Sequence, residues 1–318
     1  MPQNEHFFKG NRLKIVFLGT PQFAVPILTM LAQSEYKPLA VLCAPDKPVG
    51  RKQILTPPPA KIAAQEYGLP VYQPKNKTEL NHTISILSPA LIISAAYGLI
   101  LPKEILQTPQ FGCLNIHPSL LPKYRGASPI QAAILTGDQE TGVTIFKMDE
   151  GIDTGPIIKN SKFKIQNSKL TAPELSKELA EIGTQLLLDV LPDYLTGKIT
   201  PQPQSDSQAT YAPQITKENG KIDWRKSAAE IERQIRAFTP WPGSDIGLDG
   251  IKIVEAEIAN NENNRQVGEV FLSDGGKLAV QTGNGCLIIL KLQAAGGRPM
   301  PSNDFLRGHR QILSKILL

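Results

Sequence analysis

Two clusters of polar side chains in the first half of the chain have the composition of a proton-transfer site. In the first cluster, the amide of Asn115 and the imidazole of His117 alternate with Leu114 and Ile116. Alternate side chains of a strand point to opposite faces, so Asn115 and His117 would lie side by side on one face. Pro118 keeps His117 extended and ends the strand. An amide in this place can donate to a developing oxyanion, and an imidazole can do the same or move a proton.

The second cluster follows about thirty residues later and carries the carboxylates of Asp149, Glu150 and Asp153. A carboxylate beside an imidazole orients the ring and favours its protonated form, which suits acid–base work. Each cluster alone also has a structural interpretation. The Asn–His pair could be satisfied by local backbone, and the carboxylates could lie in a solvated turn to which Gly151 and Gly155 give backbone freedom.

The elements around both clusters alternate between strand-like and helix-like segments. The predicted strands are Leu13–Leu18, Pro38–Cys43, Ala90–Ala96, Cys113–His117 and Gly142–Lys147. The predicted helices are Phe23–Leu31, Pro59–Tyr67, Leu80–Leu87, Pro129–Leu135 and a long one, Ala172–Val190. This alternation predicts an α/β fold with a Rossmann-like parallel sheet, covered by helices on both faces. Open sheets of this kind place their sites at the carboxyl ends of the strands, where His117 would lie.

A change of composition divides the chain. Residues 1–12 are polar and predict a short flexible extension, and residues 13–195 form the α/β domain with the polar clusters. Residues 196–213 are polar and proline-bearing, as linkers are. Residues 214–318 hold one amphipathic helix, Ser227–Phe238, followed by short strands with Asp-Gly and Asn-Gly turns. That pattern predicts a small OB-like β-barrel domain.

Composition sets limits on the class of protein. The 318 residues are 41% hydrophobic and 20% charged, as in a globular protein with a real core, and the net charge is +5. No apolar run approaches the length of roughly 18 residues that a membrane-spanning helix needs. The three cysteines are far apart, which favours a reducing cytoplasm, and nothing in the four scattered histidines predicts a metal site.

The order of the motifs resembles that of a known family. The string NIHPSLLPKYRGASP at residues 115–129, followed by GIDTG at 151–155, closely resembles the folate-dependent formyltransferases. The strings GTPQFAVP at residues 19–26 and AYGLILP at 96–102 match the branch that acts on methionyl-tRNA. The resemblance extends over about residues 13–310.

The resemblance implies an activity and a set of site residues. It implies 10-formyltetrahydrofolate as the formyl donor, initiator methionyl-tRNA as the acceptor, no metal, and a catalytic trio of Asn115, His117 and Asp153. It also implies a folate-contacting loop made of Ser119, Leu120, Leu121 and Pro122. We expect the protein to act as a cytoplasmic monomer.

A basic connection after the second predicted strand is the candidate for RNA contact. Residues 44–61 carry Lys47, Arg51 and Lys52 with few acids, and their prolines and glycine predict an irregular loop. The resemblance places this loop against the tRNA acceptor arm, where its cations would neutralise phosphates. Without the resemblance, a flexible solvated loop fits the same residues equally well.

Several other functions fit part of the sequence. A sugar-nucleotide formyltransferase would share the trio and also carry an extra domain, and a glycinamide-ribotide formyltransferase would share the trio alone. A hydrolase of formyltetrahydrofolate would use water as the acceptor, and a non-catalytic RNA-binding module would need no trio. Dinucleotide binding is disfavoured, because GTPQFA lacks G-x-G-x-x-G and has proline in the phosphate turn.

Overall fold

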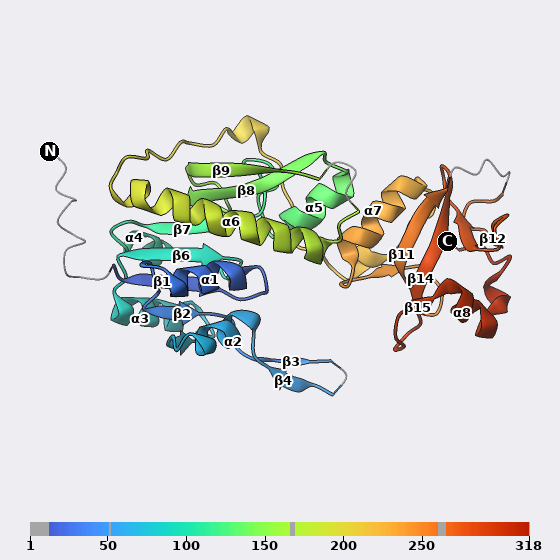
Figure 1. Cartoon of the computed structure of the whole chain (residues 1–318), viewed down its shortest axis with the longest axis horizontal. Helices are drawn as coiled ribbons and strands as arrows, with labels where there is room; N and C mark the ends of the chain where they lie inside the picture. The colour runs from blue at the N-terminus through green and yellow to red at the C-terminus, as the bar shows by residue number, and fades with distance from the viewer. Residues whose placement is uncertain (1–12, 51, 166–168, 260–264, 318) are drawn as a thin grey trace. The chain divides into compact units, whose positions relative to one another are not determined.

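The computed structural model describes residues 13–50, 52–165, 169–259 and 265–317 (Figure 1). The chain divides into two compact units that interleave in sequence. The first unit holds the residues up to Gly126, Glu140–Lys164 and Ser176–Tyr211. The second holds Ala127–Gln139, Ile165–Leu175 and the residues from Ala212 onward. The domain limits of 13–195 and 214–318 stay a prediction.

The first unit is built on a seven-stranded sheet with the order β5-β2-β1-β6-β7-β8-β9. Five strands are parallel: β1 (Ile15–Gly19), β2 (Ala40–Leu42), β5 (Val71–Tyr72), β6 (Leu91–Ala95) and β7 (Cys113–His117). They are short apolar runs, and all residues of β1, β2 and β6 are buried, as a sheet covered on both faces requires.

The predicted Rossmann-like parallel sheet is confirmed, and the structure adds an antiparallel edge that the strand–helix alternation does not predict. Strand β8 (Glu140–Lys147) is antiparallel to β7, and β9 (Ile157–Lys164) is antiparallel to β8. The short connection between β8 and β9 forms a hairpin, and two strands joined in this way must run in opposite directions. Antiparallel edge strands are common on otherwise parallel sheets.

Helices α1 (Ala24–Gln33), α2 (Pro59–Glu66), α3 (Lys77–Leu87), α4 (Lys103–Gln107) and α6 (Ala172–Leu195) connect or cover these strands. Figure 1 shows α6 lying across the β6–β9 half of the sheet. Gly183 allows this close approach, because a Cβ atom there would lie 2.8 Å from Ile116 of β7 and 3.2 Å from Val143 of β8. The core beneath α6 therefore supports the strand that carries Asn115 and His117.

The basic connection is more regular than the sequence predicts. It forms an antiparallel hairpin of β3 (Lys47–Val49) and β4 (Ile54–Thr56), which pairs with no other strand in the described chain. This stretch forms a hairpin because Val49, Ile54 and Leu55 favour strands and flank a turn at Gly50, whose φ is +71°. All described residues of the two strands are exposed.

The second unit contains an antiparallel sheet with the order β10-β11-β14-β13-β12, and β15 pairs with β14. Its strands are β10 (Ser244–Asp245), β11 (Lys252–Ala259), β12 (Val270–Leu272), β13 (Leu278–Gln281), β14 (Cys286–Gln293) and β15 (Met300–Pro301). Its helices are α5 (Pro129–Thr136), α7 (Ala228–Phe238) and α8 (Ser302–Gly308). Helix α7 begins with a complete capping box of Ser227 and Glu230. The OB-like form of this sheet stays a prediction.

The segment expected to link the domains has partners of its own. The backbones of Gln202 and Ile157 exchange two hydrogen bonds of 2.7 Å, and Arg125 N donates to Thr210 O at 2.9 Å. Residues 202–210 therefore pass over the first unit beside β9 and the turn that follows β7.

Candidate active site

Strand β7 delivers the amide and the imidazole to the same face of the sheet. Leu114 and Ile116 are fully buried on the opposite side, while Asn115 is partly exposed and His117 is 4% exposed. The side-chain amide of Asn115 has no hydrogen-bond partner among the residues that the structure describes. It is thus a donor available to a ligand.

The loop after β7 determines which ring nitrogen of His117 is available. Nε2 of His117 lies 2.9 Å from the carbonyl oxygen of Tyr124. A carbonyl can only accept, so Nε2 carries the proton and donates it to Tyr124. The other nitrogen, Nδ1, then faces Asp153, whose Oδ2 lies 3.6 Å away. That separation is an ion-pair distance and not a direct hydrogen bond. Proton exchange at His117 is therefore confined to Nδ1.

The hairpin between β8 and β9 holds the carboxylate in this position. Asp153 has a φ of +54°, in the left-handed region that non-glycine residues rarely adopt. Its Oδ2 accepts a 2.8 Å hydrogen bond from Gly126 N, and its side chain is 16% exposed. At the start of the hairpin, Asp149 accepts from Thr154 Oγ1 and from Gly151 N, which closes the turn. The structure thus brings His117 and Asp153 together and places Asn115 two residues before His117 on the same face of β7.

The predicted folate-contacting loop is partly an internal support. Ser119 is fully buried and donates to Lys123 O at 2.6 Å, and Leu121 is 4% exposed. Thr144 of β8 fastens this loop by donating to Ser119 O and accepting from Leu121 N. Only Leu120 and Pro122 of the four residues keep partly exposed side chains. Contact between this loop and folate stays a prediction.

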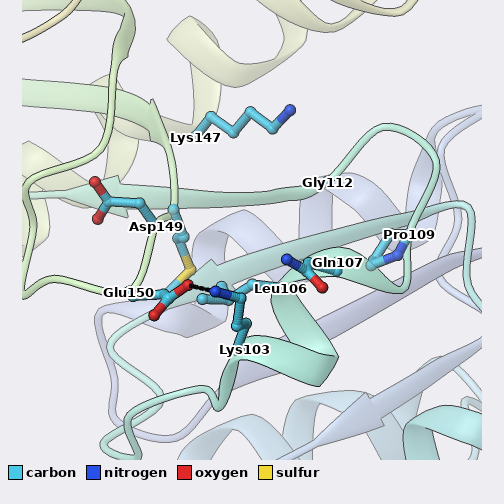
Figure 2. Close-up of a pocket in the computed structure, with 9 residues that line it drawn as sticks. Lys103, Leu106, Gln107, Pro109, Gly112, Lys147, Asp149 and Glu150 are labelled. Atoms are coloured by element: carbon cyan, nitrogen blue, oxygen red, sulfur yellow. Dashed lines mark ion pairs between the residues drawn. The ribbon is translucent and has the colours of Figure 1, made fainter.

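A groove of about 370 Å³ lies at the base of the same hairpin (Figure 2). Its lining includes α4 on one side and Met148, Asp149 and Glu150 on the other. Figure 2 shows Lys103 reaching across to Glu150, an ion pair of 2.6 Å that raises the pKa of Lys103. None of Asn115, His117 and Asp153 lines this groove, so the groove does not contain the trio.

Two cysteine thiols and one tyrosine hydroxyl of the first unit are buried in places that do not favour their ionised, reactive forms. Burial raises the pKa of the Cys43 thiol to about 11 and that of Cys113 to about 12, so neither supplies a thiolate near neutral pH. Burial likewise raises the pKa of Tyr97. Within the described residues there is no cluster of three or more potential metal ligands. None of the described helices has both the length and the apolar character that a membrane crossing demands.

The predicted RNA contacts lie apart from the trio in sequence. Lys47 and Lys52 are exposed on the β3–β4 hairpin, beside the exposed apolar side chains of Val49, Ile54 and Leu55. Arg51, the third predicted contact, lies outside the described residues. In the second unit, Arg233 and Arg236 donate to the carbonyls of Leu135 and Leu170, so both also have structural partners.

Two residues next to the trio are not predicted from the sequence. Arg125 is 2% exposed, and Gln204 links it to the backbone of the Asp153 hairpin. Arg125 stands inside the string at residues 115–129, and Gln204 stands inside the expected linker. No local pattern marks Arg125, because the string at residues 115–129 carries a second cation, Lys123, and several other polar side chains.

Comparison with known proteins gives a consistent result over both parts of the chain. A family model described as "Formyl transferase" matches residues 13–191, and one described as "Formyl transferase, C-terminal domain" matches residues 214–310. A methionyl-tRNA formyltransferase of Halorhodospira halophila is 43% identical over 94% of this chain and 97% of its own length. One from Listeria monocytogenes is 44% identical over 95% and 97%. Among solved structures, an N-formyltransferase of Helicobacter canadensis has a TM-score of 0.66 at 23% identity, covering 87% of this chain and 98% of that one.

Proposed function

The chain belongs to the formyltransferase family, on the branch of the methionyl-tRNA formyltransferases, and we propose that it formylates the free amino group of methionyl-initiator tRNA. The donor is 10-formyltetrahydrofolate, and the product is N-formylmethionyl-tRNA for translation initiation. The observation that carries this function is the identity of 41–44% to curated relatives over nearly the whole chain, both matched domains included. The catalytic trio supplies the chemistry that this reaction needs.

We assign Asn115 the role of oxyanion donor. Negative charge develops on the formyl oxygen as the methionyl amine attacks the formyl carbon, and the unpartnered amide of Asn115 can donate to that oxygen. Donors of this kind stabilise the transition state by about 2.7–4 kcal/mol. The fixed position of Asn115 on a buried strand means that little reorganisation is needed when the charge appears.

We assign His117 and Asp153 the transfer of a proton from the attacking amine toward N10 of the folate. The new C–N bond forms at the methionyl nitrogen and the bond to folate N10 breaks, so one proton must leave the attacking amine and one must reach N10. Nδ1 of His117 and the carboxylate of Asp153 face each other at 3.6 Å and can relay that proton, directly or through water. The Tyr124 carbonyl keeps Nε2 protonated throughout, so the imidazole exchanges protons on one side only.

Apolar side chains near the trio fit a flat folate ring. Leu99 and Ile100 follow the carboxyl end of β6 and are 43% and 60% exposed, and Ile152 on the hairpin is 56% exposed. We infer that these residues, with Leu120 and Pro122 of the predicted loop, hold the folate by apolar contact. Exposed aliphatic side chains beside a site are typical of surfaces that a ligand covers.

The exposed β3–β4 hairpin is the proposed tRNA-binding element of the first unit. Positive charge for RNA phosphates comes from Lys47, Arg51 and Lys52. The exposed apolar side chains of the hairpin can pack against a sugar or a base. We infer that the second unit, the predicted OB-like domain of residues 214–318, binds the RNA backbone as well.

We further infer that the protein works as a cytoplasmic monomer without a metal. The trio comes from a single chain, and the proton relay needs no Lewis acid. The three cysteines are free and buried, which agrees with a reducing compartment.

The proposal is tested by offering the purified protein 10-formyltetrahydrofolate with three acceptors in parallel. These are methionyl-initiator tRNA, an amino-sugar nucleotide and glycinamide ribotide. We expect formylation of the methionyl group only. Formylation of the sugar nucleotide in place of the tRNA would assign the chain a different acceptor, and release of formate without any acceptor would indicate a hydrolase.

Replacement of the proton-relay residues is expected to remove activity without unfolding the protein. His117→Ala and Asp153→Asn should each lower kcat at least about 100-fold, because the first removes the imidazole and the second replaces the carboxylate with an amide that cannot exchange a proton. His82→Ala, on the outer side of α3, is the matched control and should leave kcat unchanged. Near-normal turnover in either site variant, with circular dichroism unchanged, would exclude the assigned roles.

Removal of the hairpin lysines is expected to weaken tRNA binding selectively. The double variant Lys47→Ala/Lys52→Ala should raise KM for tRNA while KM for the folate stays constant. The slope of log affinity against log salt should fall by about 1 for each phosphate that is no longer neutralised. Lys75→Ala/Lys77→Ala, which changes two exposed lysines at the start of α3, is the control. An unchanged salt slope in the hairpin variant would place the RNA-binding surface elsewhere.

A further inference from the structure

Asp153 adopts an unfavourable backbone conformation, so the hairpin that carries it needs external anchoring. Its φ is +54°, and the hairpin joins two edge strands of the sheet. We propose that Gln204 and Arg125 are positioning residues for formyl transfer, which hold the backbone of this hairpin so that the Asp153 carboxylate faces His117. This inference rests on the function proposed above and concerns residues that act through Asp153 without touching either substrate.

Gln204 joins the hairpin to the rest of the site through every group of its amide. Its Nε2 donates to Asp153 O at 2.8 Å and to Gly155 O at 2.7 Å. Its Oε1 accepts from Arg125 Nε at 3.0 Å. The two carbonyls can only accept and the guanidinium can only donate, so the orientation of this amide is fixed from both sides. The hairpin is thereby clamped on both sides of Thr154.

The burial of Arg125 lowers the stability of the fold, and packing alone does not explain why a charged residue stands at this position. Its side chain is 2% exposed, and it pairs through NH1 with Asp206 at 2.9 Å. Its NH2 group is buried and has no hydrogen-bond partner among the described residues. A buried cation with an unsatisfied donor lowers stability, whereas an apolar residue of similar size would not. A residue that lowers stability in this way is expected where function requires a particular arrangement of side chains.

Arg125 also lies between the two residues that orient the proton relay. Tyr124 O accepts the Nε2–H of His117, and Gly126 N donates to Asp153 Oδ2. Three successive residues therefore hold three parts of the site: Tyr124 holds the imidazole of His117, Arg125 holds the amide of Gln204, and Gly126 holds the carboxylate of Asp153. We call the hydrogen bonds of Gln204 to Arg125 and to the hairpin the Gln204 clamp. Gln204 completes the arrangement, because it links Arg125 of this turn to the backbone carbonyl of Asp153, and Gly126 of the same turn binds the Asp153 carboxylate.

Backbone bonds hold the base of the hairpin, where Met148 N donates to Cys113 O of β7 at 2.8 Å, and the remaining side-chain interactions nearer Asp153 are weaker anchors. The Lys103–Glu150 pair in Figure 2 is more than half exposed on both sides, and exposed ion pairs contribute little. The bonds from Thr154 and Gly151 to Asp149 are internal to the hairpin and cannot fix it to the sheet. Loss of the Gln204 clamp should therefore leave Asp153 with its single side-chain bond to Gly126.

Kinetics of Gln204 variants test the clamp. Gln204→Ala is expected to lower kcat by about 100-fold, because a displacement of about 1 Å in a reacting group can cost that much. KM for both substrates should stay within about twofold, since Gln204 touches neither substrate. Gln204→Glu keeps an acceptor for Arg125 but has neither donor to the hairpin, so it should show the same reduction. Gln202→Ala is the matched control, because this side chain is exposed and its one hydrogen bond among the described residues is to Thr200 O.

Amide hydrogen exchange separates positioning from general destabilisation. In Gln204→Ala the Gly126 amide, which donates to Asp153 Oδ2, should exchange at least about tenfold faster than in wild type. The Leu121 amide, which donates to Thr144 Oγ1, should keep its protection. Equal acceleration at both amides, or turnover equal to that of Gln202→Ala, would overturn the proposal. Exchange is measured without substrates, so an inactive wild type would contradict the proposed function while the clamp is still tested.

Discussion

The hydrogen bond from His117 Nε2 to the carbonyl oxygen of Tyr124 determines what chemistry the site can perform. It assigns one ring nitrogen to the backbone and leaves Nδ1 as the only nitrogen that can exchange a proton. The direction of Nδ1 then determines on which side of the ring a proton-exchanging partner must lie. Gly126 holds the Asp153 carboxylate on that side. On the same strand face, the side-chain amide of Asn115 has no hydrogen-bond partner in the part of the chain that the structure describes. The sheet, with α6 packed over Ile116 and Val143, keeps the imidazole from moving away from this arrangement.

The backbone near the site is strained at the residues that produce this geometry. Tyr124 has a φ of +62° and Asp153 a φ of +54°, and neither is glycine. Such conformations persist only where the surroundings hold them. The internal bonds of Ser119, Thr144 and Leu121 hold the first turn, and the Gln204 clamp holds the second. The fold therefore supports the backbone beside the residues that we propose to act on the formyl carbon.

Local sequence pattern predicts part of the site and cannot predict the rest. Alternation in residues 113–117 is enough to place Asn115 and His117 on one face, because strand geometry is fixed by the backbone. The partner of Nε2 is a backbone carbonyl, and no residue type identifies it in a sequence. Gln204 is 79 residues from Arg125, and their hydrogen bond depends on the path of a segment with the composition of a linker. The sequence does not predict the antiparallel edge, because the polar, alternating β9 does not resemble the buried strands before it.

If His117 and Asp153 act as one proton relay, a double-mutant cycle tests their coupling most directly. The cycle compares kcat/KM for wild type, His117→Ala, Asp153→Asn and the double variant with methionyl-tRNA as the acceptor. When two residues act as a unit, the double variant should be no slower than the slower single variant, and this is the expected result. If the two reductions multiply instead, the residues act independently and the relay proposed from the Nδ1–Oδ2 geometry is contradicted.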